Sequence, residues 1–115
     1  ETKLLVTGCE HTTDGKKFIR PFYPQWNDKI QEGINTISSP SVLTIKNDDI
    51  LYFDENLINL MDTDYYYRLK LKHGLPQILN DISVVNRTHI NSVTNTVVNI
   101  ELTKKEKIYT QNKYE

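Results

Sequence analysis

Alanine is absent from this chain of 115 residues, and cysteine, glycine and proline are scarce, with one, four and four copies. Alanine is the best helix former, whereas β-branched and aromatic residues favour strands, so its absence shifts the expected structure towards sheet. Ile, Asn, Lys and Thr dominate instead, a bias typical of AT-rich coding DNA. The single Cys9 excludes an intramolecular disulfide and favours a reducing, intracellular compartment.

Long apolar runs and an excess of one charge are also missing. No apolar run approaches the ~18 residues of a membrane span. No charged-then-apolar leader opens the sequence, so we expect that a leader was either removed or never there. Fourteen basic and fifteen acidic residues leave a formal charge of −1, which gives no global argument for nucleic acid or an anionic membrane as the partner. Seven Tyr, three Phe and one Trp supply enough apolar surface for one core. We expect a single domain over residues 1–115, whose size and ragged ends favour a fragment of a longer protein.

Short strands are predicted along most of the chain. The turn signal Asp14-Gly15 predicts a hairpin between the first two strands, and the polar residues 46–49 predict a second hairpin. Residues 108–115 either add an edge strand or fray. The predicted strands are residues 3–7, with Gly8 as their end, then 17–20, 42–45, 50–53, 65–72, 84–85 and 96–102.

One helix is predicted over residues 24–37. Pro24 suits the first turn of a helix, and an apolar stripe follows at spacings of four, four and three, which places Trp26 in the core. The stripe consists of Trp26, Ile30, Ile34 and Ile37. Residues 75–82 have the start and stop signals of a second, short helix, and residues 104–107 are predicted to form a last turn.

These elements predict an α+β fold in which an antiparallel, curved sheet packs against the helix at residues 24–37. An all-β barrel or sandwich is the alternative.

Residues with catalytic or metal-binding chemistry do not form a known motif. The candidate metal ligands Cys9, His11, His73 and His89 lack zinc-site spacing, and no calcium loop is present. There is also no nucleophile elbow, phosphate loop or dinucleotide fingerprint. We therefore expect no metal, no cofactor and no enzymatic activity.

The most distinctive pattern is the alternation in residues 65–72. If they form a strand, Tyr66, Arg68, Lys70 and Lys72 share one face, about 7 Å apart, which approximates the spacing of phosphates on an extended single strand. A solvated sheet face is the ordinary interpretation of such a pattern. The other two interpretations are a docking face for a protein and a surface for single-stranded nucleic acid.

A compact domain without site chemistry usually acts by presenting a surface. The leading hypothesis is a non-enzymatic interaction module that offers a sheet face or an edge strand to a protein partner, or to a copy of itself, within a larger assembly. Binding of single-stranded nucleic acid through Tyr66, Arg68, Lys70 and Lys72 is the second hypothesis. A secreted or virion-surface domain is the third, because Asn86-Arg87-Thr88 has the form of a glycosylation acceptor.

Overall fold

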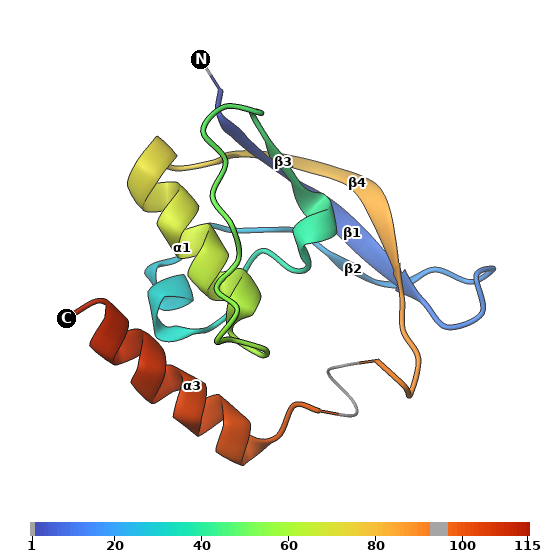
Figure 1. Ribbon diagram of the computed structural model, residues 1–115. Coiled ribbons are helices and arrows are strands. Elements are labelled where there is room, and N and C mark those ends of the chain that lie inside the picture. Colours follow the sequence, from blue (N-terminus) through green and yellow to red (C-terminus); the bar gives the residue numbers. More distant parts are fainter. Residues whose placement is uncertain (1, 93–96) are drawn as a thin grey trace.

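The central element of the fold is β1, Leu4–Thr12, which pairs with each of the other three described strands in a four-stranded sheet. The computed structural model describes residues 2–92 and 97–115. Two strands pair antiparallel with β1: β2, Ile19–Phe22, beside its second half, and β3, Leu43–Ile45, beside its first half. The fourth strand, β4, Gln77–Arg87, runs parallel to β1 over almost its whole length and therefore occupies the other edge (Figure 1).

The first predicted hairpin is present, but β1 extends further than the sequence indicated, and β2 begins two residues later than predicted, at Ile19. Gly8 does not end β1, which continues to Thr12. A Cβ at Gly8 would lie 2.9 Å from the carbonyl oxygen of Phe22 and 3.1 Å from the Cδ1 atom of Ile82. Gly8 thus allows the neighbouring strands to approach β1 closely.

The second predicted hairpin is wrong. β3 pairs with β1, and residues 50–53 form no strand. These residues cover a helix instead: the carbonyl oxygen of Leu51 accepts a 2.8 Å hydrogen bond from the Tyr65 hydroxyl, and the Phe53 ring stacks on the Tyr65 ring at 4.2 Å.

That helix is α1, Met61–His73, so the strand predicted for residues 65–72 is also wrong. Acidic residues in the first turn of α1 and basic residues in its last turn complement the helix dipole. Tyr65, Tyr66 and Leu69 are buried against the sheet, and full burial of such side chains contributes roughly 1.5–3 kcal/mol each. The rest of the core consists of Leu4, Val6, Cys9, Ile30, Ile37 and Val42.

The helix predicted for residues 24–37 is reduced to one 3-10 turn, η1, Asp28–Glu32. The Asn27 side chain caps its start by accepting a 2.8 Å hydrogen bond from the Lys29 N–H. Gly33 ends it in the left-handed conformation, with φ of 88°. Ile30 and Ile37 are buried as predicted, but Ile34 is 46% exposed because the apolar stripe is broken at Gly33. A second 3-10 turn, η2, Pro40–Val42, leads into β3.

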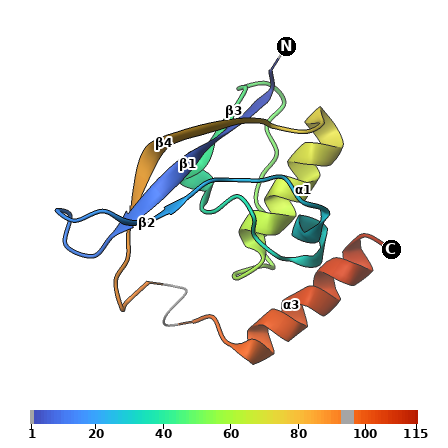
Figure 2. The same cartoon turned by 180° about the vertical axis from the view of Figure 1, so that it is seen from behind.

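The last third of the chain also differs from its prediction. Residues 77–82, predicted as part of a short helix, belong to β4. α3, Ile100–Lys113, begins inside the strand predicted for residues 96–102, of which residue 96 lies outside the described residues. It also includes most of residues 108–115, for which an edge strand or a frayed end was predicted. The Asn99 side chain starts α3 by accepting a 2.8 Å hydrogen bond from the Leu102 N–H. α3 lies beside α1, away from the strands (Figures 1 and 2).

The four strands and two α-helices found in the described residues confirm the predicted α+β class and exclude the all-β alternative. The helix that packs on the sheet is α1 rather than the segment at residues 24–37. Within residues 2–92 and 97–115, no helix combines the length and the apolar character that crossing a membrane requires.

Candidate functional site

The four residues singled out in the sequence do not share a face. Side chains two residues apart share a face on a strand but point in nearly opposite directions on a helix. Tyr66 is 2% exposed, and its hydroxyl donates a 2.7 Å hydrogen bond to the carbonyl oxygen of Ser38. Burial, together with the negative charge of Asp62, raises the pKa of Tyr66 far above its ordinary value. Tyr66 is therefore a core residue, inaccessible to a base or a partner.

The three cations are directed to different parts of the molecule. The Nε atom of Arg68 lies 3.0 Å from the Asp64 carboxylate, and its guanidinium stacks over the Tyr65 ring. The Nζ atom of Lys72 lies 2.7 Å from the Asp49 carboxylate. Lys70 lines a small cavity of about 70 Å³ with Trp26, Asp28, Gln31 and Tyr67. The predicted basic strand face is therefore not formed.

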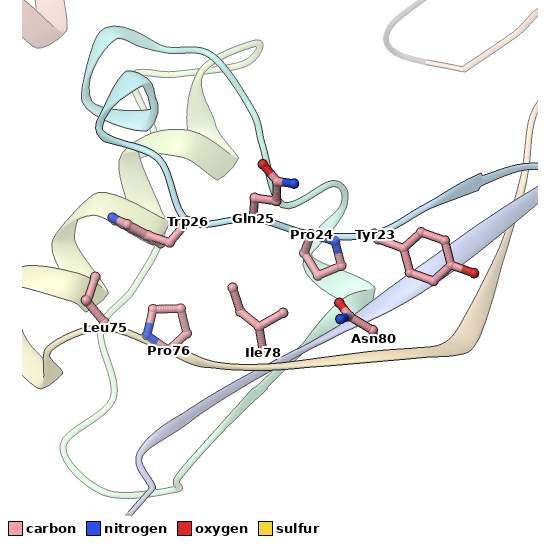
Figure 3. Close-up of a pocket in the computed structure, with 8 residues that line it drawn as sticks. All are labelled: Tyr23, Pro24, Gln25, Trp26, Leu75, Pro76, Ile78 and Asn80. Carbon is pink, nitrogen blue, oxygen red and sulfur yellow. The ribbon is translucent and has the colours of Figure 1, made fainter.

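A groove of about 820 Å³ lies between residues 23–26 and the start of β4. In Figure 3, Pro24 points from one wall towards the other, which carries Ile78 and Asn80, while the Gln25 side chain points away from the groove. The lining residues, which we call the β4 groove, are Tyr23, Pro24, Gln25, Trp26, Leu75, Pro76, Ile78 and Asn80.

Backbone hydrogen bonds and prolines hold the two walls in extended form. The Gln25 N–H donates to the carbonyl oxygen of Thr36 at 3.1 Å, and the Thr36 hydroxyl donates to the carbonyl oxygen of Gln25 at 2.6 Å. In the other wall, Pro76 restricts Leu75 to an extended conformation. Ile78 then enters the sheet in register with Val6 of β1. Both walls are thus fixed by elements outside the groove.

The lining is uncharged, and it combines aliphatic and aromatic side chains with the amides of Gln25 and Asn80. None of the eight residues is acidic or basic. Tyr23 and Leu75 are 51% and 65% exposed, so both are open to a ligand, whereas Pro24 is buried and stiffens the wall. Such a lining suits a neutral ligand that offers both apolar groups and hydrogen-bonding groups, and it gives no support to the binding of phosphate.

The candidate metal ligands are not brought together. Cys9 is buried, with its Sγ atom 3.4 Å from the Ser38 Oγ atom, and the His11 Nδ1 atom lies 2.8 Å from the carbonyl oxygen of Arg20. Among the residues that the structure describes, no three His, Cys, Asp or Glu side chains form a group that could hold a metal ion.

Asn86, the predicted glycan acceptor, lies inside β4, paired with His11 of β1. Its side-chain oxygen accepts a 3.2 Å hydrogen bond from the Ser39 hydroxyl. Glycosylation at this position stays a prediction.

Comparison with known proteins does not identify the chain: it matches no family model, no curated protein and no solved structure at a significant level. The groove must therefore be interpreted from its own residues.

The β4 groove was not predicted from the sequence, because Trp26 was expected to lie on a helix. The only signal for the groove was the short spacing of aromatic residues and proline in Tyr23-Pro24-Gln25-Trp26, together with Pro76. Neither signal shows that the two segments face one another, since that depends on the path of β4.

Proposed function

We propose that the chain is a non-enzymatic binding module that holds an extended, proline-containing peptide segment of a protein partner in the β4 groove. The observation that carries this proposal is the uncharged lining of Tyr23, Trp26, Pro76 and Ile78 along an open groove of about 820 Å³. A groove of this size falls within the roughly 300–1,000 Å³ of typical ligand sites.

The kind of ligand follows from the chemistry of the walls. Proline-rich segments adopt an extended helix without internal hydrogen bonds, and they dock into grooves lined by aromatic side chains. Tyr23 and Trp26 supply two aromatic side chains from one wall, and Leu75 and Ile78 supply aliphatic contacts from the other. Because the peptide is already extended before it binds, it loses little conformational entropy.

Single-stranded nucleic acid is a weaker candidate. That hypothesis depended on Tyr66 and three cations on one strand face, but Tyr66 is buried, and Arg68 and Lys72 are in ion pairs. A neutral groove gives no phosphate contacts and so predicts binding that changes little with salt.

Trp26 is the only tryptophan, so its fluorescence reports directly on the groove. The experiment titrates the full chain with a ten-residue peptide of repeating Pro-Pro-Leu, and in parallel with an alternating Thr-Val peptide and a ten-nucleotide oligo-dT. We expect a saturable change in Trp26 fluorescence with the proline peptide alone, with a Kd that varies less than twofold between 50 and 500 mM NaCl.

Two pairs of variants test whether the peptide occupies the groove. Tyr23→Ala should weaken binding about tenfold or more, as expected for an exposed aromatic anchor, whereas Tyr52→Ala, an 83% exposed tyrosine outside the groove, should not. Leu75→Lys should weaken it by placing a charge in the groove, whereas Leu71→Lys, at a leucine of similar exposure on α1, should not. Absence of binding at 1 mM peptide, or equal effects within a pair, would refute the proposal.

A further inference from the structure

The loop between β1 and β2 carries an exposed group of cations at one end of the sheet. This loop protrudes from the rest of the described chain, away from α1 and α3 (Figures 1 and 2). Lys16 and Lys17 of the loop are exposed, and so is Arg87, which ends β4 in register with Thr12 of β1. Among residues 2–92 and 97–115, none of these three cations is in an ion pair. Their charges are therefore open to an anionic partner.

Gly15 brings Arg87 against the loop. A Cβ at Gly15 would lie 3.3 Å from the Nη1 atom and 3.8 Å from the Cζ atom of Arg87. Gly15 has a φ of 79°, in the left-handed region that favours glycine. The guanidinium of Arg87 thus lies directly against the loop backbone, next to Lys16. A cation from β4 and two cations from the loop are joined in one surface, although they are far apart in sequence.

The conformation of the loop is fixed by its own hydrogen bonds. The Oδ1 atom of Asp14 accepts from the N–H groups of Lys16 at 2.8 Å and Lys17 at 2.9 Å. These hydrogen bonds, chiefly the one from Lys17, lower the pKa of Asp14. The buried Thr12 hydroxyl accepts from the Gly15 N–H at 2.9 Å. The backbone that carries both lysines is therefore ordered before a ligand arrives, which reduces the entropy cost of binding.

Phe18 adds an aromatic side chain next to these cations. It follows Lys17 directly and is 54% exposed. It is also the only apolar residue among residues 13–18. One exposed ring beside positive charges suits stacking on a nucleobase, which needs a single flat face. Docking to a membrane surface normally buries a larger apolar face, which residues 13–18 do not offer.

We propose that this surface, which we call the β1–β2 tip and which consists of Lys16, Lys17, Phe18 and Arg87, binds single-stranded nucleic acid. The cations bind phosphates of the backbone, and the planar guanidinium of Arg87 can bind two oxygens of one phosphate. Phe18 stacks on a base, so binding has little sequence preference. The β1–β2 tip shares no residue with the β4 groove, so the two sites can be tested separately.

The number of cations predicts how strongly salt weakens binding. For single strands, the logarithm of the binding constant falls with the logarithm of the salt concentration, with a slope of about −0.7 per phosphate contact. Three contacts give a slope of about −2, so the Kd should rise roughly 20-fold between 50 and 200 mM NaCl. The full chain is titrated into a fluorescein-labelled ten-nucleotide oligo-dT, and fluorescence anisotropy gives the Kd. Trp26 fluorescence should not change, because Trp26 lies in the β4 groove.

Two pairs of lysines separate the β1–β2 tip from the net charge of the chain. Lys16→Gln/Lys17→Gln should raise the Kd about tenfold or more at 50 mM NaCl and reduce the slope to about −0.7. Lys104→Gln/Lys105→Gln is the matched control, because these two adjacent lysines of α3 are also exposed and the change in charge is the same. The control should change the Kd by less than about twofold.

Phe18→Leu tests the stacking contact. It should raise the Kd about fivefold or more and leave the salt slope unchanged, because it removes the ring but no charge. Glu10 pairs with Val85 and so lies on the same face of the sheet as Arg87. Glu10→Gln should therefore strengthen binding about twofold, by removing a negative charge beside the tip.

Three further ligands distinguish nucleic acid from other polyanions. An abasic ten-mer has the same phosphates as oligo-dT, and it should bind about fivefold or more weakly and be insensitive to Phe18→Leu. A ten-residue oligo-glutamate and vesicles of 70% phosphatidylcholine and 30% phosphatidylserine should also bind more weakly than oligo-dT. Equal affinity for oligo-dT and the abasic strand, tighter binding to oligo-glutamate or vesicles, or no binding of oligo-dT at 50 mM NaCl would overturn the proposal. Equal effects of the two lysine pairs would do so as well.

Discussion

Glu106→Gln is the most direct test of how α3 supports α1. The substitution keeps the volume of the side chain but removes its charge, and it replaces one acceptor oxygen with an N–H₂ donor. Glu106 is buried and accepts from the N–H groups of Ile58, Asn59 and Leu60. A hydrogen bond to a charged group contributes about 1.5–3 kcal/mol, and a charge at a helix terminus about 0.3–1 kcal/mol.

Because glutamine retains one acceptor oxygen for these N–H groups, we expect the free energy of unfolding to fall by about 2 kcal/mol. Urea unfolding followed by circular dichroism measures this change. Amide hydrogen exchange at residues 58–60 should also become faster. Glu101→Gln is the matched control, since Glu101 is an exposed residue of the same helix, and it should change stability by less than about 0.5 kcal/mol. Equal stabilities for the two variants would show that Glu106 does not stabilise the segment that leads into α1.

Two further predictions concern acidic residues near α1. Asp62→Asn should stabilise the fold by about 1 kcal/mol, as measured by urea unfolding at pH 7. The reason is that burial raises the pKa of Asp62, and its Oδ1 atom has no hydrogen-bond partner among the described residues. A loss of stability would contradict this prediction. The lowered pKa of Asp54, caused chiefly by Lys113, gives stability that is present above about pH 4 and lost as the pH falls. Between pH 5 and pH 3 the urea midpoint should therefore fall more for the natural chain than for Asp54→Asn, and parallel curves would refute this.

The sequence predicted the α+β class and the first strand pair, but it failed at residues 65–72 for a specific reason. Three consecutive tyrosines satisfy both a period of two and a helical period, so alternation alone could not decide between them. The ends of the segment carried the better signal: acidic residues at 62 and 64, basic residues at 70 and 72, and Gly74 just beyond. These are the start and stop signals of a helix, and α1 begins and ends where they predict.

The prediction for residues 24–37 failed for the opposite reason. A helical stripe was present in the sequence, but the Asn27 cap and Gly33 limit the helical turn to Asp28–Glu32. The Trp26 side chain consequently lines the β4 groove instead of a helix face. The groove itself could not be predicted, because its two walls are about fifty residues apart in sequence and meet only through the pairing of β4 with β1.

The parallel pairing of β1 with β4 also constrains how the chain assembles. Leu5 pairs with Gln77, so one edge of the first strand has no partner until more than seventy further residues have been synthesised. Closing so long a loop is slow, and an open strand edge can pair with other molecules in the meantime. A nascent or truncated chain that stops short of Gln77 would therefore be prone to aggregation, and chaperones that shield strand edges should improve the yield of folded protein.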